Sequence, residues 1–116
     1  MRIVHIAAPV ALPVEEFAKR STPPPVGEDP SPQLATRAEF EDEAVSTGVW
    51  EASPGVFARA VVDAEFSHFI AGRATFVTAD GQRFEFRAGD AAYFPPYTKG
   101  IWTVHETLRK TFCVWR

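Results

Sequence analysis

Two basic residues, Arg59 and Lys110, lie in strand-like segments on faces that are otherwise apolar. Residues two apart on a strand share a face, and the neighbours that define these faces are Phe57 and Val61 for Arg59, and Phe112 and Val114 for Lys110. An apolar face points inward, where a buried charge needs a partner of opposite sign. Arg59 and Lys110 are therefore candidates to neutralise a buried carboxylate, in a charged pocket suited to a small anionic or polar ligand. The alternative is that both bases extend to the rim and stay in water.

Four aromatic residues are further candidates for a ligand site. Tyr93, Tyr97, Trp50 and Trp102 combine an aromatic wall with a polar tip, which suits the mouth of a pocket for small molecules. Packing in the core or at the rim explains each of them equally well. The ligand-binding residues that the sequence predicts are Arg59, Lys110, Tyr93, Trp102 and Trp50.

His68 follows Glu65 by three residues, so a strand turns the two side chains to opposite faces. His68 shares its face with Phe66 and Ile70, and such a face is too apolar for open water. We therefore expect this face to pack against the N-terminal segment or a second subunit, which predicts a homodimer.

The other reactive side chains favour structural roles. His105 opposes Trp102 and is expected at the outer face or rim, and His5 has no visible partner. Cys113 lies between apolar neighbours on a strand, where a small buried residue is expected rather than a nucleophile. The sequence has no Gly-rich phosphate loop, no zinc-type Cys pairs and no nucleophile elbow.

The composition is that of one ordinary globular domain. With 116 residues and a net charge of −3, the chain has room for a single core and lacks the basic stripe of nucleic-acid-binding proteins. Its single Cys cannot form an internal disulfide, and no window approaches about 18 uninterrupted apolar residues. His5, Pro9 and Pro13 interrupt the apolar run after Arg2, which argues against a signal peptide. We expect a cytoplasmic protein that binds neither nucleic acid nor membranes.

The elements that must position these residues are short strands separated by turn signals. Residues 1–34 predict a strand at 3–7, a short helix after Pro13 and a Pro-rich arm at 21–33. Residues 35–116 predict strands from 35 onward and at 49–52, 56–62, 65–70, 75–78, 83–86, 91–94, 101–106 and 108–115. Asp80-Gly81 fits a hairpin turn. The pattern predicts an all-β sandwich or barrel.

Several short motifs from about residue 48 onward form a combination that is specific when taken together. They are Gly48-Val49-Trp50-Glu51, Pro54-Gly55, Glu65, Ala71-Gly72-Arg73, Asp80-Gly81, Gly89-Asp90, Pro95, Gly100, Trp102 and Arg109-Lys110. This segment resembles the RmlC-like cupin superfamily, and within it the small cupins of the (S)-ureidoglycine aminohydrolase and ethanolamine-utilisation type. The resemblance implies a double-stranded β-helix, a jelly-roll barrel whose mouth holds the site. It also implies a homodimer in which an N-terminal segment crosses to the partner's sheet.

The family pattern binds a metal through two His, a Glu and a third His. In this chain Glu65 and Gly72 keep their spacing, while the His positions fall on Arg59 and Val61, or on Ala58 and Ala60, and on Gly100. Open metal sites use about three protein ligands, so a lone carboxylate holds a catalytic ion poorly. We predict no cofactor, and a divalent metal would need ligands other than the usual His.

The family geometry points Glu65 into the barrel, where we expect Arg59 or Lys110 to lie near its carboxylate. Two interpretations of Glu65 follow. In the first, Glu65 contacts the ligand or acts as a catalytic acid or base, and burial raises its pKa. In the second, a buried cation neutralises the Glu65 carboxylate, and the pair holds the barrel together. The resemblance accordingly implies a small cupin that binds or converts a small polar nitrogenous or carboxylated metabolite. The alternative is a non-catalytic binding or accessory dimeric module without the usual metal site.

Overall fold

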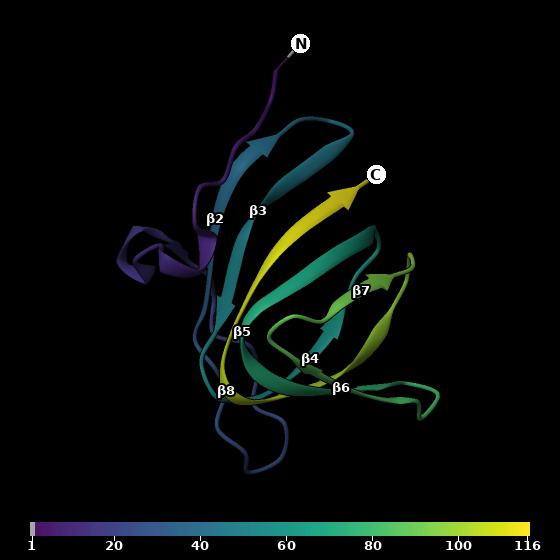
Figure 1. Ribbon diagram of the computed structural model, residues 1–116. Coiled ribbons are helices and arrows are strands. Elements are labelled where there is room, and N and C mark those ends of the chain that lie inside the picture. Colours follow the sequence, from purple (N-terminus) through teal and green to yellow (C-terminus); the bar gives the residue numbers. More distant parts are fainter. Residues whose placement is uncertain (1) are drawn as a thin grey trace.

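The computed structural model describes residues 2–116 and consists mainly of antiparallel strands (Figure 1). Two short 3-10 turns precede the strands, η1 Pro9–Ala11 and η2 Val14–Glu16. The strands are β1 Ala18–Lys19, β2 Leu34–Glu41, β3 Val45–Ala52, β4 Gly55–Ala60, β5 Ala64–Thr78, β6 Arg83–Arg87, β7 Ala91–Phe94 and β8 Lys99–Trp115. No helix among residues 2–116 is long and apolar enough to cross a membrane.

The strands β5 and β8 are each longer than the sequence predicted. The predicted pairs 65–70 with 75–78, and 101–106 with 108–115, are joined into single strands that bend instead of ending. The bend of β5 is at Gly72, which has a φ of +87°. A Cβ atom at this position would lie 2.0 Å from the carbonyl oxygen of Thr107, so only glycine lets the two strands approach so closely.

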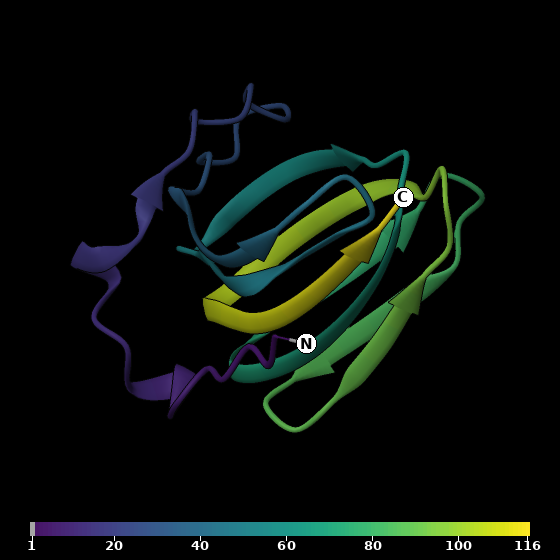
Figure 2. The ribbon, with the colours of Figure 1, turned by 90° about the horizontal axis from the view of Figure 1, so that it is seen from above.

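Because β5 and β8 bend, the single eight-stranded sheet folds over on itself, and each of these two strands contributes to both halves. One half has the order β1-β2-β3-β8-β5-β7, and the other half has the order β4-β8-β5-β6. Seen from above, the strands curve around a common interior (Figure 2). This is the double-stranded β-helix that the sequence predicted, and the all-β fold class is confirmed.

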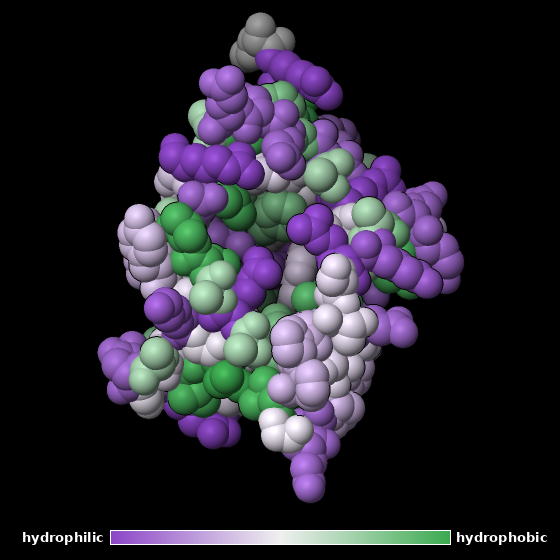
Figure 3. Space-filling view, turned by 180° about the vertical axis from the view of Figure 1, so that it is seen from behind, coloured by the Kyte–Doolittle hydropathy of each residue, from purple (hydrophilic) through white to green (hydrophobic). Residues whose placement is uncertain are grey.

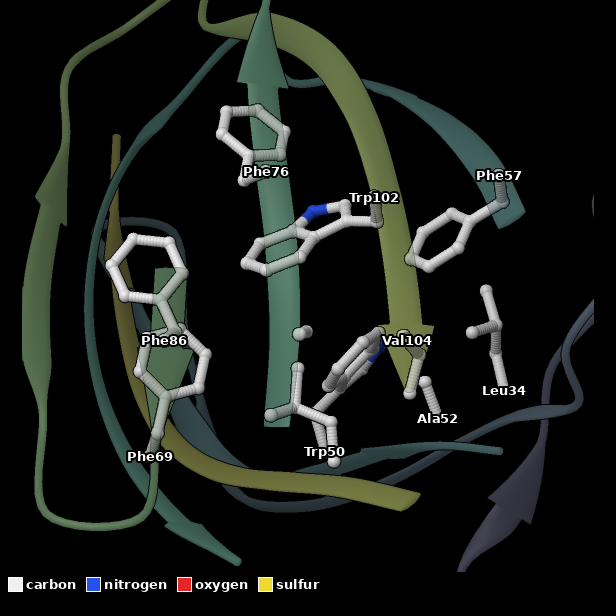
Figure 4. Close-up of a cluster of buried hydrophobic side chains, with 11 residues drawn as sticks. Leu34, Trp50, Ala52, Phe57, Phe69, Phe76, Phe86, Trp102 and Val104 are labelled. Carbon is white, nitrogen blue, oxygen red and sulfur yellow. The ribbon is translucent and has the colours of Figure 1, made fainter. Parts of the chain in front are cut away.

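Aromatic rings fill much of the interior (Figure 4). The rings of Phe69 and Phe86 stack with centroids 4.7 Å apart, and the ring of Trp102 lies 4.7 Å from that of Phe76. Each of these side chains is buried, and burial of one large ring contributes about 2 kcal/mol. The rings occupy the barrel around Trp102, so a ligand site must lie beyond them.

The N-terminal segment differs from the prediction. Residues 3–7 form no strand, and the expected helix is reduced to the single turn η2. The physical reason is Phe17, which leaves the turn to pack against Ala35 and Val49 and is only 5% exposed. The segment is thus held by one buried ring and by the pairing of β1 with β2, rather than by a helix.

The Pro-rich arm is extended, as predicted, but it also covers a sheet edge. The carbonyl oxygen of Pro30 accepts a hydrogen bond from the backbone N–H of Val56 at 2.8 Å. Pro32, two residues after Pro30, is fully buried. The arm therefore covers the start of the free edge of β4, where Val56 would otherwise offer an unpaired backbone N–H to other chains.

Candidate functional site

Glu65 and Lys110 form a buried ion pair inside the barrel. The Lys110 Nζ atom lies 2.5 Å from Oε2 of Glu65, and each residue is 7% exposed. Glu65 comes from β5 and Lys110 from β8, which are paired along this stretch. Of the two bases that strand alternation suggested, Lys110 is therefore the partner of Glu65.

A third residue completes this arrangement. The hydroxyl of Ser67 donates a hydrogen bond to the same oxygen, Oε2 of Glu65, at 2.6 Å. Both hydrogen bonds end on Oε2, and none from residues 2–116 reaches Oε1. Ser67 was not predicted as a site residue, although its position two residues after Glu65 places it on the same strand face.

The electrostatics of the pair distinguish between the two interpretations of Glu65. Burial raises the pKa of Glu65, but the charge of Lys110 and the hydrogen bonds from Lys110 and Ser67 outweigh it, and the pKa lies below its ordinary value. This direction disfavours the interpretation in which burial raises the pKa of Glu65 and favours the one in which a buried cation neutralises the carboxylate. Burial also lowers the pKa of Lys110, with Arg59 acting in the same direction and Glu65 opposing it.

Aromatic rings surround the Lys110 ammonium. Its Nζ atom lies 4.8 Å from the ring centroid of Trp50 and 5.7 Å from that of Phe94. Such contacts stabilise a cation by about 1 kcal/mol or more where water is excluded. Trp50, which the sequence proposed as a ligand-binding residue, is buried and forms one wall of this site.

Arg59 lies at the mouth of the barrel and is exposed. Together with Glu65 and Lys110 it lines a cavity of about 340 Å³ and a smaller one of about 20 Å³. No carboxylate in residues 2–116 lies within ion-pair distance of its guanidinium. Figure 3 shows that one face of the molecule is hollowed near its centre, with hydrophilic and hydrophobic residues mixed around the hollow.

The remaining predicted aromatic residues do not meet at this mouth. Trp102 is 4% exposed and reaches only the smaller cavity. Tyr93 and Tyr97 line a separate cavity of about 650 Å³ that β6 and β7 help to form. Tyr93 alternates with inward-facing residues of β7, so its ring lies outside and packs 6.2 Å from that of Trp115.

The histidines lie away from the Glu65–Lys110 pair. His5, His68 and His105 are all exposed. His68 is on the face opposite to Glu65, as alternation predicted, and His105 places Nε2 2.8 Å from the hydroxyl of Thr75. None of the three contacts the ion pair, so the site is built from a carboxylate, a hydroxyl and basic side chains.

The residues at the mouth do not fit the family's divalent metal ion. Oε2 of Glu65 is in contact with an ammonium group, and residues 2–116 contain no cluster of three or more His, Cys, Asp or Glu side chains. A Cβ atom on Gly100 would lie 2.5 Å from the ring of Phe76, so this ring fills the space of the family's third His. Oε2 of Glu65 contacts Lys110 and Ser67 instead of a set of metal-ligating side chains.

Residues 39–112 match the family model described as EutQ-like cupin domain. The EutQ protein of Clostridium difficile is similar in fold, with a TM-score of 0.66 and 19% identity over 74% of this chain and 70% of that one. A DUF861-family protein of unknown function from Pseudomonas syringae pv. tomato has a TM-score of 0.73 and 26% identity. The match covers 84% of this chain and 43% of that protein, so the chain spans less than half of its length.

A DUF861-family protein from Thermotoga maritima is also similar, with a TM-score of 0.54 and 26% identity over 55% of this chain and 73% of that one. No curated protein matches the sequence. The comparisons establish the fold and the family. They identify no substrate or reaction, so the chemistry is inferred from the residues at the mouth.

Proposed function

The chain belongs to the family of EutQ-like cupin domains, and we propose that the mouth of its barrel binds a small carboxylate-bearing metabolite. Arg59 is the ligand for the carboxylate, and the Glu65–Lys110 pair forms the polar floor of the site. The same site serves either a binding module or an enzyme in which Glu65 moves a proton. We do not extend the proposal to the reaction of the (S)-ureidoglycine aminohydrolases that the sequence resembles, because the residues at the mouth do not fit a divalent metal ion.

The observation that carries the proposal is the unpaired guanidinium of Arg59. The mouth cavity is lined by four bases and two acids, namely Arg20, Arg59, Lys110, Arg116, Glu41 and Glu65. Lys110 is neutralised by Glu65, and Arg116 lies 3.6 Å from Asp63. The surplus positive charge favours an anion, and a volume of about 340 Å³ suits a small molecule.

Isothermal titration calorimetry with lactate and with its uncharged analogue lactamide tests the proposal. We expect lactate to bind and lactamide not to bind. Arg59→Gln should weaken lactate binding about tenfold or more, because charge-assisted hydrogen bonds contribute roughly 1.5–3 kcal/mol. Arg83→Gln is the matched control, since Arg83 is paired with Glu85 at a distance from the mouth. Equal binding by Arg59→Gln and wild type, or no binding by wild type, would overturn the proposal.

We further propose that the outer face containing Phe66, Tyr93 and Trp115 is a homodimer interface. These residues are 46%, 55% and 42% exposed and lie close together on β5, β7 and β8. The N-terminal segment packs elsewhere, with Phe17 on β2 and β3 and η1 near β5, and leaves them uncovered. Aromatic residues exposed together favour a partner surface.

Light scattering at micromolar concentration tests this interface. Wild type should have the mass of a dimer, and Phe66→Glu should have that of a monomer. The matched control is Phe84→Glu on β6, because Phe84 is similarly exposed, at 43%, but lies outside this face. A monomeric wild type, or a dimer that withstands Phe66→Glu, would overturn the interface.

A further inference from the structure

Lys110 has the surroundings of an amine nucleophile. Its ammonium is buried against Trp50 and Phe94, which removes it from bulk water. A second cation, Arg59, lines the same cavity, and a proton acceptor, Glu65, is in direct contact. Lysines that react with carbonyl groups are activated by such desolvation and by a neighbouring cation.

We propose that Lys110 forms an imine with a small 2-oxo acid bound at the barrel mouth. The inference rests on the proposed function, because Arg59 must hold the carboxylate of the same molecule. A 2-oxo acid carries its ketone on the carbon next to the carboxylate. One small molecule can therefore present an anion to Arg59 and a reactive carbonyl to Lys110.

The structure supplies the groups that the step needs. Lys110 first passes a proton to Glu65, and the neutral amine attacks the ketone carbon, so that a C–N bond forms and the second bond of the ketone C=O breaks. A second proton then moves from the nitrogen to the oxygen, which becomes a hydroxyl. Glu65 then returns its proton to this hydroxyl, which leaves as water and gives a protonated imine. The ammonium ion and ketone are converted into an iminium ion and water, and no oxidant or reductant is required.

Burial of Lys110 is compatible with this access. Lys110, Glu65 and Arg59 all line the cavity of about 340 Å³, so this cavity extends to the Lys110 side chain although the residue is only 7% exposed. Oε1 of Glu65, which accepts no hydrogen bond from residues 2–116, remains available for the hydroxyl of the intermediate. A positively charged imine would keep the ion pair with Glu65 and leave the buried charge balanced.

Reductive trapping tests the proposal on the intact chain. Wild-type protein is incubated with pyruvate and cyanoborohydride, and the adduct is located by peptide mass spectrometry. The chain has three lysines, and Lys19 and Lys99 are exposed, so they serve as internal controls. We expect about tenfold more adduct at Lys110 than at either control lysine, because desolvation and a neighbouring cation favour the neutral, reactive amine. Equal yields at all three would overturn the proposal.

Two further arms separate this inference from the proposed function. Lactate has the same carboxylate but no ketone, so it should bind, protect Lys110 from pyruvate and give no adduct itself. Lactate binding without any pyruvate adduct at Lys110 would overturn the imine and leave carboxylate binding intact. If neither lactate nor pyruvate binds, both proposals fail. Lys110→Arg should abolish the adduct while keeping the charge, and if it does not fold, the wild-type peptide map decides alone.

Discussion

Arg109 and Lys110 are adjacent in β8, and their side chains lie on opposite faces of the sheet. The Lys110 ammonium lies inside the barrel on Glu65, whereas the Arg109 guanidinium lies on the outer face, 2.7 Å from Oε1 of Glu51. Arg109 also donates hydrogen bonds to the backbone carbonyls of residues 9, 10 and 12. Both residues are less than 8% exposed. One dipeptide therefore anchors the candidate site and the N-terminal segment.

Replacing Arg109 should release the N-terminal segment. Arg109→Met removes the carbonyl contacts and the cation from the ring of Phe17, whose centroid lies 4.8 Å away. We expect a Glu-specific protease to cleave at Glu15 or Glu16 about tenfold faster, because local opening becomes easier. Arg37→Met is the matched control, since Arg37 binds Glu16 of the same segment at the surface, where ion pairs contribute little. Equal rates for both variants would contradict this role of Arg109.

Removing one partner of the Glu65–Lys110 pair should lower the free energy of unfolding more than replacing both partners by apolar residues. Lys110→Met leaves Glu65 charged and buried, and we expect a loss of about 3 kcal/mol in the free energy of unfolding, measured by urea denaturation. The double variant Glu65→Leu/Lys110→Met keeps the volume without charge, and it should recover most of this loss. A double variant as unstable as the single one would indicate that the pair adds net stability.

Gly100 should tolerate no side chain while Phe76 is present. The Cβ of Gly100→Ala would lie 2.5 Å from both the ring of Phe76 and the carbonyl oxygen of Val77. We expect a loss of about 2 kcal/mol in unfolding free energy from this overpacking. In a Phe76→Leu background the same change should cost less, because one of the two clashes is relieved. An equal cost in both backgrounds would show that Phe76 does not fill the third His position.

The barrel was predictable because its signals are local. Turn motifs such as Asp80-Gly81 and the alternation of apolar residues identified the strands, and alternation alone brought Lys110 to the inner face. What local patterns lack is the pairing between distant strands. The contact of Arg109 with Glu51 depends on the register of β3 and β8, which no short pattern encodes.

The position of Tyr93 shows the same limit in the candidate site. Its residue type suits a ligand pocket, but the inner face of β7 belongs to its neighbours Ala92 and Phe94, which pack against the core. The four residues of β7 were too few to fix its orientation from sequence. The N-terminal helix was overpredicted for a related reason, since the charge pattern favours a helix while burial of Phe17 ends it.

The lowered pKa of Glu65 determines how the contribution of the ion pair to the free energy of unfolding changes as the pH falls. The unfolded chain takes up a proton near the ordinary pKa of 4.5, whereas the folded chain does so only at lower pH. The pair therefore contributes stability above pH 4.5 and loses it as the pH falls through the lower, folded pKa. If burial without Lys110 dominated, the pKa would be raised and the sign reversed.

Urea denaturation from about pH 7 to about pH 3 measures this sign. Wild type should lose more unfolding free energy below pH 4.5 than the double variant Glu65→Leu/Lys110→Met, which lacks the pair. A hydrogen bond from Thr75 also lowers the pKa of Glu85, but this group is present in both proteins and cancels in the difference. Parallel curves would mean that Glu65 does not titrate with a lowered pKa, and a relative gain by wild type in acid would mean that burial outweighs Lys110.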